Sequence, residues 1–498
     1  VVYIAFIALA GASALFGLRH GADSGAARDE PAPTEAPPKV SQRLAWFTFA
    51  ALGSFLLLAI TNHVCTNIAS IPFLWVAPLS LYLLSFILCF DGRGWYRRRL
   101  NFLLTGALLI PMAGLLASAT LTLDLKLIVP LYLAGLFISC MFCHGELALR
   151  KPSPTYLTGF YLMISLGGAV GALLVGVIAP HALPGYFELG FGLTAVALLL
   201  TSQLRREVLP YKVAGFIVTV AVAAAWVYQI EIYSAQTRLM ARNFYGSLRT
   251  WDTTISGELI RKFVHGAILH GHQFLSAERS RQPTTYYAET SGVGRALTAL
   301  NSSNRRIGVI GLGAGTLAVY GKAGDYLRVY EINPQVIDIA LKEFTFIGMS
   351  PAKIDIVLGD ARLNLEKEAA QRFDLLVIDA FSGDAIPVHL ITREAVAVYH
   401  RHLQPGGVLA FHVTNRYLQL APVVKQLADS YGLSSVLVGD EPLSTDKEIY
   451  SSTDWVLVSA NKKFLQQETF QQAAKAIIDY PNRHPWTDDF NNLLQILK

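Results

Sequence analysis

Residues able to bind a nucleoside stand at four consecutive predicted strand ends in the second half of the chain. They are a turn with glycines at Gly311, Gly313 and Gly315, followed by Glu331, Asp360 and Asp379. Glycines let a backbone turn tightly and approach a ligand closely. Glu331 stands 16 residues after Gly315, at the end of the next predicted strand, where it can accept hydrogen bonds from ribose hydroxyls.

Asp360 and Asp379 end the third and fourth predicted strands. Ligands of open α/β sheets bind outside the carboxyl ends of the strands, so both carboxylates should face one pocket. Asp360 is placed there to hold an adenine amine. NAD is the main rival ligand, but neither aspartate has an obvious role in binding NAD. The four strand ends together predict an adenosine-type ligand.

The elements that must position these residues alternate between strand and helix. Apolar strands are predicted at 306–311, 327–332, 353–359, 373–379, 406–413 and 454–460. Helices are predicted after the Gly-rich turn and from Pro334, Ala361 and Thr392. This alternation is typical of a doubly wound, largely parallel sheet of the Rossmann-like α/β class. In front of it, short β-like segments between 243 and 287 predict a small antiparallel β-domain.

Composition divides the chain into two unlike halves. Of its 498 residues, 53% are apolar and only 15% are charged, and the mean hydropathy is +0.40. Residues 1–235 carry 14 Lys or Arg and 10 Asp or Glu, whereas residues 236–498 carry 27 and 26. The length and the high apolar content exclude a disordered, fibrous or small disulfide-rich protein. The uneven distribution of charge predicts a polytopic α-helical membrane domain followed by a soluble domain.

Eight apolar runs approach the length needed to cross a bilayer, about 20 helical residues. They are 2–18, 44–62, 71–90, 102–120, 127–145, 156–180, 187–203 and 213–230. Gly167 and Gly171 are spaced for close packing of two helices. The chain starts at Val1 without a methionine, so we expect upstream sequence and a truncated first helix rather than a signal peptide.

Lys and Arg gather in alternate loops between these runs. The first, third, fifth and seventh loops carry four, four, two and three of them, and the other three loops share only Lys126. By the positive-inside rule the charged loops are cytoplasmic, and eight spans then put the soluble domain on the outer face. We nevertheless expect it at the cytoplasmic face of a bacterial-type inner membrane, because its predicted ligand is made in the cytosol. A count that is wrong by one span would remove the conflict between the loop charges and the expected cytoplasmic position of the soluble domain.

Other functional classes have weaker support in the sequence. Cys140 to His144 matches the c-type haem pattern CMFCH but lies in a predicted membrane helix. His265 and His270 lack the spacing of zinc ligands, and we expect no metal. The second half contains no cysteine and no Lys/Arg-rich stripe, so we expect neither disulfides nor nucleic-acid binding there.

At these residues the chain resembles the spermidine synthase (polyamine aminopropyltransferase) family, specifically its membrane-embedded relatives. The resemblance covers roughly residues 243–438, and the stretch CHGELALRKPSPTYLTGFYLMISLGGAVG resembles the membrane segments fused to such domains. It implies a fold of the class I methyltransferase and spermidine synthase type, with S-adenosylmethionine or its decarboxylated form as substrate. Gln273, Glu331 and Asp360 would then hold the nucleoside.

The same resemblance implies catalytic residues. Asp379 would take up the proton of the attacking amine, and Tyr287 and Glu289 match the Tyr-x-Glu that opens the family's active-site loop. Asp384 follows Asp379 by five residues, whereas the family's second aspartate usually follows by three. Two more histidines, His389 and His412, stand on the ligand side of strand ends.

Two departures concern amine recognition. Ala314 stands in the Gly-rich turn where soluble spermidine synthases have an aspartate, and Ala288 replaces their Gln or His within Tyr-x-Glu. Loss of the turn carboxylate removes a charge that would repel the carboxylate of intact S-adenosylmethionine, so that form should fit better. Asp488 and Asp489 near the C-terminus are candidates to replace the missing amine ligands.

The sulfonium of such a substrate has three activated carbons, which leaves several reactions open. With an amine bound, Asp379 as base would give aminopropyl transfer and methylthioadenosine. Without an acceptor, the substrate's own carboxylate could displace methylthioadenosine and leave homoserine lactone, a lyase reaction that mainly needs orientation. Methyl transfer is a third outcome. A polyamine or nucleoside transporter or sensor is the alternative of another class.

We therefore predict three parts: a transmembrane domain at 1–235, a small β-domain at 236–290 and a nucleoside-binding catalytic domain at 291–498. The expected partners are a small-molecule substrate, with a polyamine as one candidate, and the lipid bilayer. The sequence leaves the oligomeric state open, a homo-oligomer included.

Overall fold

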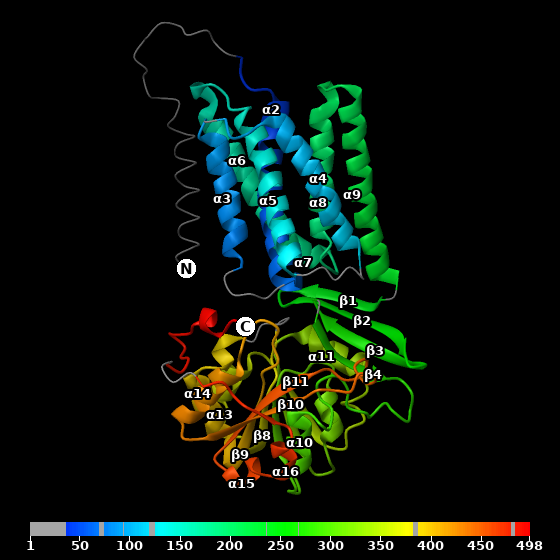
Figure 1. Ribbon diagram of the computed structural model, residues 1–498, viewed down its shortest axis with the longest axis vertical. Helices are drawn as coiled ribbons and strands as arrows, with labels where there is room; N and C mark the ends of the chain where they lie inside the picture. The colour runs from blue at the N-terminus through cyan, green and yellow to red at the C-terminus, as the bar shows by residue number, and fades with distance from the viewer. Residues whose placement is uncertain are drawn as a thin grey trace.

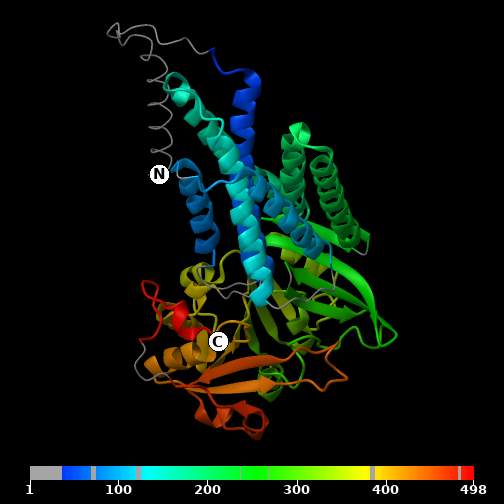
Figure 2. The same cartoon turned by 45° about the horizontal axis from the view of Figure 1, so that its top comes forward.

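The computed structural model describes residues 36–68, 74–92, 94–118, 125–235, 237–266, 268–381, 387–479 and 484–498. A bundle of apolar helices stands over an α/β domain, and a four-stranded sheet lies between them on one side (Figure 1). The same arrangement is seen when the molecule is tilted (Figure 2). The apolar run predicted at 2–18 and the candidate residue Asp384 lie outside the described residues.

The bundle is built from the apolar runs of the first half. Its helices are α2 (Val40–Asn62), α3 (Val76–Phe90), α4 (Arg98–Ala117), α5 (Leu125–Ala148), α6 (Leu157–Leu173), α7 (Ala179–Ala182), α8 (Glu188–Gln203) and α9 (Leu209–Ala235). Short 3-10 or π turns extend them at η1 (His63–Ile68), η2 (Pro154–Tyr156), η3 (Leu174–Ile178) and η4 (Leu204–Arg206). Each of the seven runs predicted after residue 40 therefore forms helix.

Five helical segments are long and apolar enough to cross a membrane: Val40–Cys65, Arg98–Ala117, Lys126–Ala148, Pro154–Ala182 and Leu209–Ala235. The runs predicted at 71–90 and 187–203 form helices α3 and α8 of 15 and 16 residues. Both are shorter than the roughly 20 residues that a bilayer requires. Within the described chain, the expectation of about eight spans is corrected to five candidate spans and two shorter helices. Helix α3 begins at Val76, after a turn at 74–75, and the run at 187–203 is itself too short to cross a bilayer.

Helices α2 and α6 pack with their backbones in contact. A Cβ atom at Gly171 would lie 2.1 Å from the Ala51 carbonyl oxygen, and one at Gly167 would lie 2.4 Å from the Phe47 carbonyl oxygen. Only a residue without a side chain fits at such distances. The close packing predicted from the spacing of these two glycines is confirmed.

The β-like segments after the bundle form an antiparallel sheet with the order β1-β2-β3-β4. Its strands are β1 (Thr237–Asn243), β2 (Gly246–Ile255), β3 (Glu258–His265) and β4 (Ile268–Phe274). The antiparallel sheet predicted for this region is confirmed. The β1–β2 turn lies nearest the bundle, since Ser247 donates its hydroxyl to the carbonyl of Pro184 at 3.3 Å.

The α/β domain contains an eight-stranded sheet with the order β12-β10-β11-β9-β8-β5-β6-β7. Its strands are β5 (Arg306–Ile310), β6 (Tyr326–Glu331), β7 (Lys353–Leu358), β8 (Phe373–Ile378), β9 (Leu403–His412), β10 (Ser434–Asp440), β11 (Thr453–Ser459) and β12 (Ala474–Lys475). Strands β5 to β9 are parallel, and β10 to β12 pair antiparallel. The Rossmann-like prediction is confirmed, with β10 and β12 as additions.

Helices cover both faces of this sheet and enclose two apolar cores. They are α10 (Gly292–Ala299), α11 (Pro334–Lys342), α12 (Ala361–Lys367), α13 (Arg393–His402), α14 (Ala421–Ser430), α15 (Lys462–Leu465) and α16 (Glu468–Gln471), with 3-10 turns η5 (Thr316–Tyr320), η6 (Val388–Leu390) and η7 (Leu493–Ile496). Helices α11, α12 and α13 start where predicted, each capped by a side chain: Asn333, Asp360 and Thr392.

The helix predicted directly after the Gly-rich turn is wrong. The chain forms only the five-residue turn η5 there, between Gly315 and Gly321. Gly315 has a left-handed φ of 84°, which lies outside the α-helical region, and glycine is unfavourable within a helix. The Gly-rich turn therefore lacks a long helix behind it.

The α2–α6 contact predicts a sharp difference between two glycines of α6. Gly171→Ala should destabilise the bundle by about 1–3 kcal/mol, because the new methyl group meets a backbone carbonyl that cannot move aside. The unfolding midpoint of the detergent-purified protein measures this. Gly159→Ala is the matched control, since nothing lies within 4 Å of a Cβ atom there. Equal midpoints for the two variants would contradict the prediction.

Candidate nucleoside-binding site

The Gly-rich turn is pressed between the end of β8 and the β-domain. Gly311 and Gly313 have φ angles of 98° and 53°, which favour glycine. A Cβ atom at Gly311 would lie 2.3 Å from the Asp379 carbonyl oxygen, and one at Gly313 would lie 3.0 Å from the His270 carbonyl oxygen. Because side chains are excluded, the turn exposes backbone at the sheet edge.

Glu331 holds this turn in place from the end of β6. Its carboxylate accepts a hydrogen bond from the backbone N–H of Leu312 at 3.0 Å and another from that of Asn333 at 2.8 Å. The residue is only 8% exposed. Burial raises the pKa of Glu331 above its ordinary value, although the two backbone N–H groups oppose the shift.

A cavity of about 790 Å³, counting the part open to solvent, lies at the carboxyl ends of β5, β6, β7 and β8. The structure brings five of the sequence-predicted residues to its wall: Gly311, Gly313, Glu331, Asp360 and Asp379. The β-domain supplies another side of the wall with Tyr245, His265 and His270. The two sheets together thus bring residues between 245 and 390 around one space.

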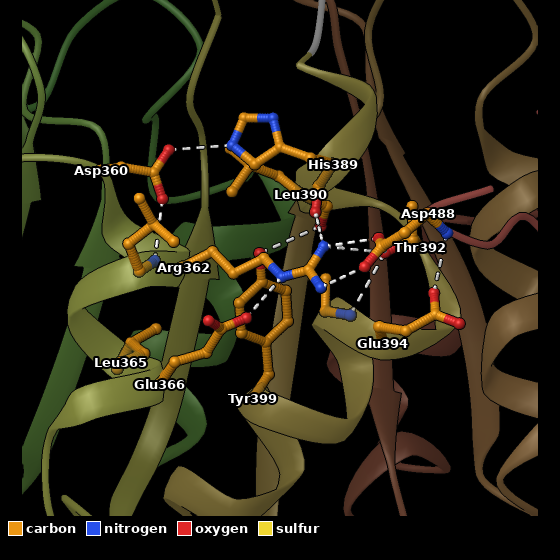
Figure 3. A network of polar contacts seen from close by, with 12 residues as sticks. Asp360, Arg362, Leu365, Glu366, His389, Leu390, Thr392, Glu394, Tyr399 and Asp488 are labelled. Atoms are coloured by element: carbon orange, nitrogen blue, oxygen red, sulfur yellow. Dashed lines mark hydrogen bonds and ion pairs between the residues drawn. The ribbon is translucent and has the colours of Figure 1, made fainter. Parts of the chain in front are cut away.

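Asp360 lies at the end of the cavity nearest α12. One carboxylate oxygen caps α12 by accepting from the backbone N–H of Leu363 at 2.9 Å, and the other lies 2.9 Å from Nε2 of His389 (Figure 3). Both residues line the cavity. His389 therefore joins the candidate site as the partner of Asp360.

Asp379 is held on both carboxylate oxygens. The Tyr287 hydroxyl donates to one oxygen, and Nδ1 of His412 lies 2.7 Å from the other. Burial and the charge of Asp379 raise the pKa of Tyr287 well above its usual range, so this phenol stays protonated and donates. The side chain of Asp379 is 3% exposed. The result is a buried carboxylate with two fixed donors.

His412 is fixed by an aromatic cage. Its ring stacks on Trp455 with centroids 4.5 Å apart and lies 4.8 Å from the ring of Tyr286. With Nδ1 donating to Asp379, Nε2 is left to accept from the Thr453 hydroxyl at 3.1 Å. His412 therefore orients Asp379 and has no nitrogen left to contact a ligand.

The structure does not bring every predicted residue to the cavity. Gln273 instead uses its amide to join the β-domain to neighbouring segments: it donates to the Ser280 carbonyl and to the Thr345 hydroxyl of the α/β domain at 2.9 and 2.7 Å. Glu289 is exposed, and it lines none of the cavity wall that the described residues form. Gly315 lies behind the turn, where a Cβ atom would be 2.9 Å from Ile347.

Ala314 has a packing reason to be small. It is fully buried, and its Cβ lies 2.7 Å from the position that a Cβ at Gly271 of β4 would take. An aspartate at 314 would have to displace β4 or point elsewhere. The contact between the Gly-rich turn and β4 therefore explains why alanine, and not aspartate, stands at position 314.

Asp488 is not available as an amine ligand. Its carboxylate forms a two-point ion pair with Arg362 at 2.6 and 2.7 Å and accepts from the Thr392 hydroxyl at 2.8 Å (Figure 3). The Arg362 guanidinium lowers the pKa of Asp488. Arg362 also donates to the carbonyl of His389 at 2.9 Å, so this pair holds the loop that carries His389.

Sequence reasoning missed some residues of the cavity wall. His270 was considered only as a zinc ligand, but burial lowers its pKa to about 3, and its neutral ring lines the cavity. Asn333 follows Glu331 and also lines it, as does Tyr245 of the β1–β2 turn. The position of Asn333, two residues beyond a strand end, was a usable signal. Nothing local marks Tyr245.

The described residues contain no group of three or more His, Cys, Asp or Glu side chains that could hold a metal ion. Within this part of the chain, the site presents carboxylates, neutral imidazoles and backbone N–H groups. These groups can donate and accept hydrogen bonds with a nucleoside, and the carboxylates can interact with a positively charged ligand.

Comparison with curated proteins shows that the chain is similar to polyamine aminopropyltransferases. It is 33% identical over 116 residues to the polyamine aminopropyltransferase of Vibrio vulnificus, covering 22% of this chain and 38% of that one. It is 23% identical over 248 residues to a probable polyamine aminopropyl transferase of Bifidobacterium longum, covering 46% and 52%. The chain thus spans about two fifths to half of the length of these relatives. It is also 31% identical over 131 residues to a protein described as an O-methyltransferase of Mycobacterium avium, covering 25% and 56%.

No family model matches the chain. Among solved structures, spermidine synthase of Thermotoga maritima aligns with a TM-score of 0.35 at 17% identity, covering 49% of this chain and 81% of that one. A probable spermidine synthase of Corynebacterium glutamicum aligns with a TM-score of 0.37 at 18% identity, covering 45% and 81%. In sequence, the chain is similar to enzymes of polyamine synthesis and to methyltransferases.

Proposed function

We propose that the protein is a membrane-bound enzyme that acts on S-adenosylmethionine or its decarboxylated form and releases methylthioadenosine. The observation that carries the proposal is the meeting of the Gly-rich turn, Glu331, Asp360 and Asp379 in one cavity. Similarity to polyamine aminopropyltransferases supports it.

Each wall of the cavity suits one part of such a substrate. Glu331 would accept hydrogen bonds from the ribose hydroxyls, and Asp360 with His389 would contact the adenine. The exposed backbone of the turn at Gly311 and Gly313 would lie against the nucleoside. Gln273 would act indirectly, by holding the segment at Thr345 to the β-domain.

Asp379 would face the sulfonium. A carboxylate that is 3% exposed attracts a positive charge more strongly than one in water, because the surrounding medium screens it less. The neutral His270 adds no positive charge to the cavity wall. In aminopropyl transfer the attacking nitrogen gains positive charge as the sulfonium loses it, and a carboxylate already fixed in place would stabilise that developing charge with little reorganisation.

Aminopropyl transfer is the primary reaction. An amine nitrogen would attack the aminopropyl carbon beside the sulfur, the carbon–sulfur bond would break, and its electron pair would stay on sulfur in methylthioadenosine. Asp379 would take the proton that the new secondary amine releases. Tyr287 would orient Asp379, while Glu289 and Asp384 stay predictions for the amine side.

A lyase reaction is the second candidate, and the bonding of Asp379 favours it. Both carboxylate oxygens of Asp379 already accept hydrogen bonds, from Tyr287 and His412, so an amine proton would have to compete with donors that are already in place. In this reaction a carboxylate oxygen of S-adenosylmethionine attacks its own γ-carbon, and the electron pair of the broken bond goes to sulfur. Methylthioadenosine and homoserine lactone form, and no base is needed. The small Ala314 would leave the substrate carboxylate unopposed.

The membrane location is also a proposal, and charge supports a sidedness. Figure 1 shows which ends of α2, α4, α5, α8 and α9 lie far from the α/β domain. Ten described Lys and Arg residues lie at or beside these helix ends: Lys39, Arg43, Arg97, Arg98, Arg99, Arg150, Lys151, Arg205, Arg206 and Lys212. At the near end, the described helix ends and loops carry only Lys126. The positive-inside rule then favours the far end as cytoplasmic and the α/β domain on the opposite face. We propose this orientation in place of the cytoplasmic one expected from the substrate.

Product analysis tests the reaction. Detergent-purified protein is incubated with S-adenosylmethionine or its decarboxylated form, each with and without putrescine, and products are identified by mass spectrometry. We expect methylthioadenosine in at least one mixture, and Asp379→Asn should slow its release about a hundredfold or more because the carboxylate charge is lost.

The products separate the candidates. Spermidine formed only with the decarboxylated substrate and putrescine establishes aminopropyl transfer, whereas homoserine lactone from S-adenosylmethionine alone establishes the lyase. Asp429→Asn is a matched control, since Asp429 is an exposed aspartate of α14 that does not line the cavity. Absence of methylthioadenosine from every mixture would refute the proposal.

Glu331 predicts a pH dependence of binding. Ribose hydroxyls donate to its ionised form, so the nucleoside stabilises a carboxylate whose pKa burial has raised. Affinity for methylthioadenosine should therefore be highest above that pKa and fall by up to about tenfold per pH unit below it. Calorimetric Kd values measured from neutral to weakly acidic pH check this.

Glu331→Gln isolates the contribution of Glu331 to this pH dependence, because glutamine has nearly the same size and shape as glutamate but does not titrate. Its binding should be weaker and nearly flat with pH. His270 stays neutral throughout, since its pKa is about 3, and burial also lowers the pKa of His265. The other cavity groups, Asp360, Asp379 and His389, are common to both proteins. Parallel pH profiles for the two proteins would argue against a ribose contact at Glu331.

Cysteine labelling in intact cells tests the sidedness. The α/β domain has no native cysteine, so Lys463→Cys introduces one on its exposed surface. A membrane-impermeant maleimide should label this variant but not Lys151→Cys at the far end of the bundle. The unsubstituted protein, with its four cysteines in the bundle, is the background control. The opposite pattern would place the domain in the cytoplasm.

A further inference from the structure

A buried ion pair joins the helical bundle to the β-domain. Arg242 in β1 donates to both carboxylate oxygens of Glu188, the first residue of α8, at 2.9 Å each. The same guanidinium donates to the Gly185 carbonyl at 2.9 Å and lies over the Tyr186 ring, 4.3 Å from its centroid. The two charged side chains are 3% and 4% exposed.

A buried ion pair of this kind fixes the relative position of the two segments that carry it, because separating the charges would leave each of them buried without a partner. Removing one partner strands the other charge in a medium that solvates it poorly. The guanidinium is planar and binds the carboxylate at two points, which sets its orientation as well as its position. The end of β1 is thereby held against the α7–α8 loop.

Asn243, the residue after Arg242, connects the ion pair to the cavity wall. Asn243 donates its side-chain amide to the Oδ1 atom of Asn333 at 2.7 Å, and its own Oδ1 accepts from the backbone N–H of Tyr245 at 2.9 Å. Asn333 and Tyr245 both line the cavity. One side chain therefore links the ion pair to two positions of the wall.

The contact with Asn243 also sets the orientation of the Asn333 amide. Oδ1 of Asn333 accepts from Asn243 and from the backbone N–H of Gln335 at 3.0 Å. Its Nδ2 is buried without a partner among the described residues. The backbone N–H of Asn333 donates to Glu331 at 2.8 Å. Asn333 thus presents a spare donor beside the carboxylate proposed to hold the ribose.

Tyr245 is fixed in the same way. Its carbonyl accepts from Nε2 of His265 at 2.7 Å, and His265 lines the cavity as well. Burial lowers the pKa of His265, which keeps this ring neutral. The β1–β2 turn is therefore held from the bundle side by Arg242 and from the β-domain side by His265.

We propose that Glu188 and Arg242 are positioning residues of the nucleoside cavity, through which the helical bundle completes its ribose side. Asn333 Nδ2, set by Asn243, is the donor that this arrangement offers to a ribose hydroxyl. The bundle then acts as part of the binding site and is more than an anchor. The inference rests on the proposed function, since it assumes a nucleoside in the cavity.

Binding of methylthioadenosine and of its 2′-deoxy analogue to the full-length protein tests the inference. Glu188→Gln and Asn243→Ala should each raise the Kd for methylthioadenosine at least tenfold. Asn243→Ala should affect the 2′-deoxy analogue much less, so the preference for the ribose form shrinks. A purely structural role would lower the unfolding midpoint and leave that preference unchanged.

The matched control breaks another ion pair of the bundle, at its far end. Arg98→Gln removes the 2.7 Å contact with the buried Glu146, which keeps Arg150 as a partner at 2.6 Å. Its Kd should stay within twofold of the unsubstituted protein. A similar rise in Kd for Arg98→Gln would mean that any damage to the bundle weakens binding, and would overturn the inference.

The remaining outcomes are also decisive. Unchanged Kd values for Glu188→Gln and Asn243→Ala overturn the inference even though the unsubstituted protein binds. If Glu188→Gln does not fold, Asn243→Ala decides alone, because it leaves the ion pair intact. Failure of the unsubstituted protein to bind methylthioadenosine refutes the proposed function instead.

Discussion

Parallel hydrogen bonding of β5 to β6 on one side and to β8 on the other sets the positions of the Gly-rich turn, Glu331 and Asp379 at the cavity. Ile310 pairs with Tyr330 and with Ile378, so the next residues of the three strands leave the sheet together. The pairing continues into the loops: the N–H of Gly311 donates to Tyr330 and that of Asp379 to Ile310, both at 2.9 Å. A one-residue slip in register would turn side chains such as Glu331 to the other face of the sheet. The chemistry of the site is therefore a consequence of register.

Electrostatic balance explains which polar groups the cavity can keep. Glu331 and Asp379 are almost fully buried, and each meets two hydrogen-bond donors instead of a cation. Arginine side chains near the site are paired elsewhere, as Arg362 is with Asp488. Buried histidines in the wall stay neutral, since burial lowers the pKa of His270 to about 3. Among the described residues no Lys or Arg lines the cavity, so its carboxylates are open to a cationic ligand such as a sulfonium.

Local patterns predicted most of the fold and part of the site. Strand ends such as Glu331 and Asp360 are visible because an apolar run stops at an acidic residue, and Gly167 and Gly171 are visible because their spacing is helical. Partners distant in sequence are not visible in this way. His412 meets Asp379 only because β9 pairs with β8, and Arg242 meets Glu188 only because two domains touch. Hydropathy likewise located the apolar runs but not the turn at 74–75 that precedes α3. The exposed position of Glu289 depends on tertiary packing that a motif match does not contain.

Anchoring alone does not account for the helical bundle. One apolar helix of about 20 residues holds a domain at a membrane. This bundle instead buries polar groups, among them Glu146 with Arg98 and Arg150, and His144 with Ser85 at 2.9 Å. Buried ionisable groups are costly, and a bundle that served only as an anchor would have no need of them. The contact of Glu188 with Arg242 connects this same bundle to the cavity wall. Coupling between two sites is reciprocal, so a bundle that shapes nucleoside binding must itself respond to the bound nucleoside.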